Sequence, residues 1–65
     1  MITVREDVSL EAVRRDLRRF DALPDRTAPL FVVDHDEHLR GVLPLDRLLI
    51  KDPDTPVGTA MLTRP

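Results

Sequence analysis

Residues 30–49 read LFVVDHDEHLRGVLPLDRLL, and this stretch decides the fold. Two apolar runs, residues 30–33 and 39–43, are each short enough to form a buried strand. Between them, residues 34–38 are all acids and histidines, and a charged turn is ordinary between paired strands. The pattern therefore predicts a β-hairpin.

A proline follows the second apolar run. Pro44 has no N–H to donate to a sheet ladder, and its φ suits the first position of a helix. We therefore predict a short helix over residues 45–50, with Leu45, Leu48 and Leu49 facing inward. The remaining segment, residues 53–65, carries further prolines and is predicted as an exit segment with one helical turn near VGTAM.

A longer helix is predicted before the hairpin. Ser9 is a good N-cap for residues 10–20, LEAVRRDLRRF. Leucine, valine, leucine and phenylalanine recur at helical spacing in this segment and place an apolar stripe on one face, formed by Leu10, Val13, Leu17 and Phe20. Two prolines in residues 21–29 should end the helix.

The β-branched residues 2–4, ITV, predict a short first strand. The expected order is therefore β-α-β-β-α. This is an α+β (α/β) fold in which a small sheet carries two helices on one face.

The small size of the chain predicts a partner. A domain of about 60 residues buries only about 60% of the surface that its unfolded chain exposes, so its core is marginal. The 65 residues include no cysteine, which excludes a disulfide and a cysteine-based zinc site. Another protein surface is the remaining common source of stability, and we expect self-association.

Composition argues against several classes of function. The formal net charge of -2 is unlike that of a nucleic-acid-binding domain, and we expect no nucleic-acid partner. No run approaches the ~18 consecutive apolar residues of a membrane span, so we expect no membrane insertion of this segment. There is no cysteine or tyrosine nucleophile, and Ser9 has no histidine placed as its base, so we do not expect an enzyme.

The apolar run ending in Asp34, the turn, and the segment LRGVLPLDRLL with Gly41 resemble the cystathionine-β-synthase motif, or CBS motif. The resemblance covers roughly residues 2–52. The continuation DPDTPVGTAM looks like the linker of MgtE-type magnesium transporters, where a second CBS motif begins near a methionine, here Met61. We therefore assign residues 1–52 to a single CBS motif and residues 53–65 to the linker and the start of a second motif.

The resemblance implies a regulatory function. CBS motifs act in pairs, sheet against sheet, so the implied partner is a second copy in a homodimer or a second CBS motif. The implied protein is a transporter of magnesium or another divalent cation. Its transmembrane domain would lie in the inner membrane, and this chain would be cytosolic and control transport in response to ion or nucleotide level. The alternative is a free-standing CBS-type dimerisation or interaction module without a ligand response.

The resemblance also implies where a nucleotide would bind. In the family, a serine or threonine and an aspartate after the glycine hold the phosphate and ribose. The matching places are Pro44, which follows Leu43, and Arg47. Proline offers no hydroxyl, and arginine cannot accept hydrogen bonds from the ribose hydroxyls. If Leu43, Pro44 and Arg47 line a nucleotide site, adenine nucleotides should bind it weakly or not at all.

Two groups of acids are candidate Mg²⁺ ligands, because this ion takes carboxylate oxygens and keeps several waters. One group lies in the turn between the predicted strands and the other flanks Pro53: Asp34, Asp36 and Glu37, then Asp52 and Asp54. A chain without its neighbouring domains should bind Mg²⁺ only weakly, at millimolar levels.

Two other interpretations of the turn remain open. It could be a plain polar turn, or His35 and His38 could share a transition metal. Glu37 stands where the family often has glycine, which implies a backbone that tolerates positive φ.

Overall fold

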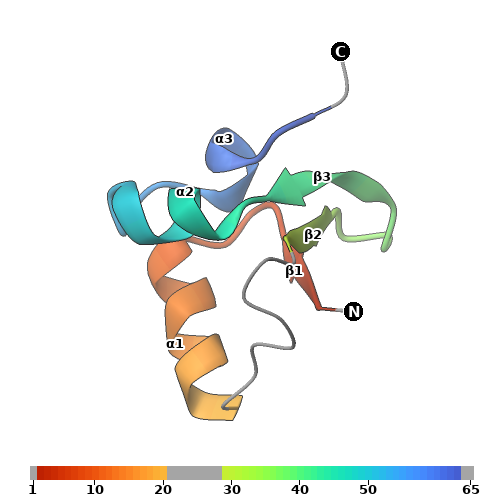
Figure 1. Ribbon diagram of the computed structural model, residues 1–65. Coiled ribbons are helices and arrows are strands. Elements are labelled where there is room, and N and C mark those ends of the chain that lie inside the picture. Colours follow the sequence, from red (N-terminus) through yellow and green to blue (C-terminus); the bar gives the residue numbers. More distant parts are fainter. Residues whose placement is uncertain (1, 21–28, 64–65) are drawn as a thin grey trace.

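The computed structural model describes residues 2–20 and 29–63. Its elements follow the predicted order (Figure 1): β1 (Thr3–Arg5), α1 (Leu10–Phe20), β2 (Leu30–Val33), β3 (Leu39–Leu43), α2 (Leu45–Ile50) and α3 (Val57–Ala60). The hairpin strands and the first two helices have the predicted bounds, and α3 is the predicted helical turn. The first strand is shifted by one residue. The predicted break at residues 21–29 lies almost wholly outside the described residues.

The three strands form one sheet in the order β1-β2-β3. β1 runs parallel to β2, which α1 makes possible by crossing between their ends, and β2 pairs antiparallel with β3. Val4, Val32 and Gly41 are aligned across the sheet, so these three positions share one face. A register shift between Val32 and Val33 interrupts the hairpin ladder.

The core lies on the helical face of the sheet. In Figure 1, α1 and α2 lie together to the left of the strands. One cluster of buried side chains joins the strands to all three helices: Leu10, Val13, Leu30, Val32, Leu43, Leu48, Val57 and Ala60. Leu17 packs against this cluster, whereas the side chain of Phe20 lies outside the described part of the structure. The predicted sheet with helices on one face is confirmed.

The predicted cap of α1 is confirmed and extended. The Oγ of Ser9 accepts a hydrogen bond from the N–H of Ala12 at 3.1 Å. The carbonyl of Thr55 also accepts a hydrogen bond from the N–H of Leu10 at 2.9 Å. Because the first N–H groups of a helix have no partner within it, the loop before α3 stabilises the start of α1.

The segment after α3 extends the edge of the sheet. Val42 and Leu62 exchange two backbone hydrogen bonds of 2.9 and 2.7 Å. Gly41 permits this approach, because a Cβ at that position would lie only 2.5 Å from the carbonyl oxygen of Leu62. Residues 53–63 therefore pack on the same body as the sheet. The domain boundary after residue 52 remains a prediction.

One detail of α2 differs from the prediction. The helix begins at Leu45 as predicted, with Pro44 as its N-cap at φ -64° and ψ 145°. Leu48 is buried as expected, but Leu49 is 68% exposed, so its predicted inward position is wrong. Leu49 lies about 100° around the helix from Leu48, and a six-residue helix can bury only a narrow stripe. Within the described residues, none of the helices has the length and apolar character needed to span a membrane.

Candidate functional site

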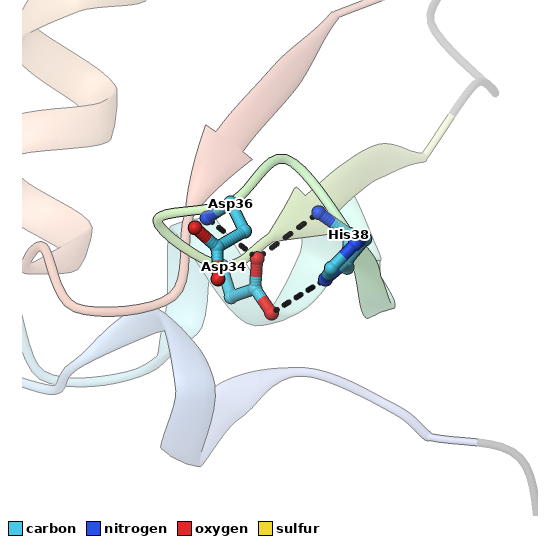
Figure 2. Close-up of side chains that lie close together, drawn as sticks. All are labelled: Asp34, Asp36 and His38. Atoms are coloured by element: carbon cyan, nitrogen blue, oxygen red, sulfur yellow. Dashed lines mark hydrogen bonds and ion pairs between the residues drawn. The ribbon is translucent and has the colours of Figure 1, made fainter.

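The turn between β2 and β3 is organised around Asp34. Its Oδ1 accepts hydrogen bonds from the N–H of Asp36 at 2.8 Å and from the N–H of His38 at 3.0 Å (Figure 2). The N–H of Asp34 donates to the carbonyl of His38 at 3.0 Å, which closes the turn. Glu37 has φ 67°, as its glycine-like position predicted. The carboxylate of Asp34 thus stabilises a turn in which Glu37 has a backbone conformation that glycine adopts more easily.

The turn brings three metal-binding side chains together. Donor atoms of Asp34, Asp36 and His38 lie within 4.8 Å of one another. The Oδ2 of Asp34 is 3.6 Å from the Nδ1 of His38, and Figure 2 shows the imidazole beside that carboxylate. Asp34 and Asp36 were predicted as metal ligands, whereas His38 was predicted to share a transition metal with His35. Glu37 is not part of this group, although it lies in the same turn.

The environment of Asp34 favours its charged form. The N–H of His38 donating to the carboxylate, helped by the N–H of Asp36 and the nearby histidines, lowers the pKa of Asp34 below its usual value. Partial burial of the group opposes this effect. Asp34 is therefore a carboxylate at neutral pH and can accept these bonds or bind a cation.

Asp52 and Asp54 form a separate turn before α3. The Oδ1 of Asp52 accepts a hydrogen bond from the N–H of Asp54 at 2.9 Å, and its carbonyl accepts one from Thr55 at 3.0 Å. Asp52 therefore shapes the loop that caps α1. Within residues 2–20 and 29–63, a group of three side chains that could hold a metal ion occurs only at the β2–β3 turn.

The predicted nucleotide residues lie at the junction of β3 and α2. Leu43 is fully buried in the core, and Pro44 is half-buried where α2 begins. Arg47 reaches across to α3, where its Nη1 donates a hydrogen bond of 3.1 Å to the carbonyl of Ala60. This contact gives Arg47 a structural role that was not predicted, because Ala60 lies 13 residues away along the chain.

The face of the sheet opposite the helices carries apolar side chains. Phe31 is half-buried and Leu39 is 65% exposed. Together with Thr3, Val33 and Glu37 they line a shallow hollow of about 360 Å³. We call Phe31, Val33 and Leu39 the open sheet face.

No protein-family model matches the chain, and no curated protein does. Solved structures do match. The cytosolic domain of the Mg²⁺ channel MgtE in complex with ATP is 36% identical over 97% of this chain and 25% of that one, with a TM-score of 0.83. The soluble part of a magnesium transporter is 23% identical over 98% and 25%, with a TM-score of 0.83. The cystathionine-β-synthase pair domain of a putative Mg²⁺ transporter from Shewanella oneidensis MR-1 is 19% identical over 95% and 35%, with a TM-score of 0.77.

The chain belongs to the CBS domain family. It spans about a quarter of the MgtE cytosolic domain that it matches, so it corresponds to one part of that domain. The similarity to the MgtE cytosolic region confirms the resemblance stated from Gly41 and the residues around it.

In this CBS motif, Pro44 and Arg47 remain the notable departures from the family pattern. Arg47 donates to a backbone carbonyl and Pro44 begins a helix without a side-chain cap. Weak nucleotide binding at these residues remains a prediction.

Proposed function

We propose that this CBS motif is a non-enzymatic regulatory module in the cytosolic part of a transporter of magnesium or another divalent cation. The attached transport domain would lie in the inner membrane. The observation that carries the proposal is the 36% identity to the MgtE cytosolic domain over 97% of the chain. In this proposal, the motif helps to control transport in response to ion level.

The motif performs this role as one half of a pair. Its helical face is filled by the core, whereas the open sheet face leaves Phe31 half-buried and Leu39 exposed. Since a core this small supplies little stability, covering that face against a second sheet would stabilise the folded chain. The partner is a second CBS motif, or a second copy when the chain is alone.

Mg²⁺ is the ligand that this proposal favours. Carboxylates stand at Asp34, Asp36 and Glu37 in one turn and at Asp52 and Asp54 in another. An ion between such acids and those of a neighbouring domain would relieve their mutual repulsion and draw the domains together. Adenine nucleotide is less favoured, because Pro44 has no hydroxyl and Arg47 is bound to Ala60.

The second candidate is a free-standing CBS-type interaction module without a ligand response. The contact between Arg47 and Ala60 supports it, because it engages the side chain at the predicted nucleotide position in a hydrogen bond between α2 and α3. The two candidates share the fold and the pairing, so only a ligand response distinguishes them.

Pairing is tested by light scattering during size exclusion at micromolar concentration. We expect the chain to be a dimer and Leu39→Asp to be a monomer, because the substitution puts a charge on the open sheet face. Leu49→Asp is the matched control, since Leu49 on α2 is equally exposed, at 68% against 65% for Leu39. A monomeric parent chain, or loss of the dimer in the control alone, would contradict pairing through the sheet.

The ion response is tested by thermal melting in about 10 mM MgCl₂ against NaCl of matched ionic strength, because screening alone also relieves acidic repulsion. An ion present at ten times its dissociation constant stabilises the folded state by about 1.4 kcal/mol. That corresponds to a rise in Tm of at least ~5 °C in a domain of this size. Equal melting temperatures in the two salts would favour the interaction module.

A further inference from the structure

We propose that the β2–β3 turn is a binding site for a divalent transition metal of the zinc, cobalt or nickel class. Its ligands are the Oδ2 of Asp34, the carboxylate of Asp36 and the Nδ1 of His38. The site shares Asp34 and Asp36 with the acids proposed for the Mg²⁺ response, but its existence depends neither on that response nor on pairing.

The turn holds the first ligand in position. Because both backbone N–H bonds go to the Oδ1 of Asp34, its Oδ2 is the oxygen left facing His38, at 3.6 Å from the Nδ1. His38 is itself fixed through its backbone, which both donates to and accepts from Asp34. The carboxylate of Asp34 and the backbone of His38 therefore start from positions set by hydrogen bonds that metal binding does not have to break.

Only small side-chain movements would complete the site. The donor atoms of the three residues already lie within 4.8 Å of one another. Metal–ligand bonds of roughly 2.0–2.2 Å need donors a little more than 3 Å apart in a tetrahedral site. The side chains of Asp36 and His38 are 62% and 76% exposed, so both can rotate toward Asp34 without disturbing the core.

The charge around the turn also suits a cation. Within the described residues, the ion pairs of Asp34 and Asp36 are made with His38 and His35, and each histidine is charged only when protonated. The nearby Arg40 pairs with Glu6 instead, at 3.5 Å. At neutral pH, the two carboxylates therefore have no permanently charged partner in this part of the molecule.

The mixture of ligands selects the class of metal. Mg²⁺ prefers oxygen ligands in near-ideal octahedral geometry. An imidazole together with carboxylates suits zinc, cobalt or nickel, whose affinities for such sites exceed those of the earlier divalent ions. With three protein ligands, water fills the remaining position or positions.

The experiment is a titration of the tag-free chain with CoCl₂, followed by visible absorption, with ZnCl₂ then added to displace the cobalt. We expect a cobalt band that saturates at one ion per chain, is displaced by Zn²⁺ and persists in about 10 mM MgCl₂. His38→Gln should weaken binding by at least about tenfold, since loss of even an outer-shell partner of a metal ligand costs 10–100-fold. Its backbone bonds to Asp34 remain, so the turn should stay folded.

His35→Gln is the matched control, because His35 lies in the same turn but outside the group of three. Because the Nε2 of His35 pairs with Asp36 at 3.4 Å, its replacement should weaken cobalt binding, but clearly less than His38→Gln does. Asp36→Asn provides a second ligand variant if His38→Gln does not fold, and it should weaken binding to a similar extent. The absence of a cobalt band, equal loss in His35→Gln, or displacement of cobalt by Mg²⁺ would each overturn the assignment.

Discussion

Replacing Gly41 by alanine tests whether the segment after α3 is an integral part of the fold. Gly41 lies in β3 beside Leu62, and the Cβ of an alanine would sit 2.5 Å from the carbonyl oxygen of Leu62. The same Cβ would lie 3.1 Å from the sulfur of Met61, which is flexible and can move. The clash with the backbone cannot be relieved by a side-chain rotation.

The expected loss of stability in Gly41→Ala comes from the two backbone hydrogen bonds between Val42 and Leu62. The 2.5 Å separation must lengthen to the 3.4 Å at which ordinary van der Waals contact begins. That movement breaks or strains both hydrogen bonds between Val42 and Leu62. At ~0.5–1.5 kcal/mol each, and with ~0.5–1 kcal/mol regained because alanine suits a strand better than glycine, the net loss is about 1 kcal/mol. Tm should fall by about 4–8 °C.

The assay is thermal and urea unfolding of four chains: the parent, Gly41→Ala, a chain ending at Ala60, and the shortened chain with Gly41→Ala. In the shortened chain the clashing carbonyl is absent, so alanine should be neutral or stabilising by up to ~1 kcal/mol. The comparison forms a double-mutant cycle whose coupling energy isolates the contact with Leu62.

A Gly41→Ala chain as stable as the parent would refute this reasoning. So would an equal loss of stability in the full and shortened chains, because the cost would then arise within the hairpin and not from the segment after α3.

Three further predictions concern the predicted ligand residues, the helix cap and pH. Calorimetry should detect no micromolar binding of ATP to the parent chain, whereas the double change Pro44→Ser and Arg47→Asp should create measurable binding. Tight binding of ATP by the parent chain would contradict the prediction that Pro44 and Arg47 disfavour nucleotide binding. Ser9→Ala should lower the free energy of unfolding by about 1 kcal/mol, because the N–H of Ala12 loses its hydrogen-bond acceptor. Urea unfolding measures this change, and an unchanged midpoint would refute the stabilising role of Ser9 as the N-cap of α1. The pKa of Asp34 is lower in the folded chain than in the unfolded chain, so the ionised carboxylate should stabilise the fold fully above the unfolded pKa of about 3.9 and lose this effect as the pH falls through the folded pKa. In melting curves between about pH 6 and pH 2, Asp34→Asn should remove this part of the acid sensitivity. A pH profile identical to that of the parent chain would count against this role of Asp34.

The elements that local sequence decides were predicted well. The hairpin strands, α1 and α2 depend on apolar runs, a polar turn, Pro44 and the Ser9 cap, all of which act within a few residues along the chain. The positive φ of Glu37 was also predicted, because the family places glycine there and the turn requires the same backbone in this chain.

The contacts that join distant segments were not predicted. The carbonyl of Thr55 caps α1 at Leu10, Leu62 pairs with β3, and Arg47 bonds to Ala60. Each joins residues at least 13 positions apart, and two of the three are made by backbone groups that every residue carries. Side-chain patterns cannot specify such partners, so these contacts emerge only when the segments are packed together.

The same limit explains the error at Leu49 and the omission of His38 from the predicted metal group. Apolar spacing identifies which side chains favour burial, but Leu49 stays exposed because the described part of the chain has nothing to cover it. In the turn, His38 was paired with His35 because the two are close in sequence, yet the hydrogen bonds of Asp34 bend the backbone so that His38 lies beside Asp34 while His35 pairs with Asp36. Local chemistry therefore predicts which residue types are available at the turn, and the closing of the turn on Asp34 decides which of them meet. For this reason the comparison of His38→Gln with His35→Gln is the decisive one: the sequence treats the two histidines alike, and only the geometry of the turn separates them.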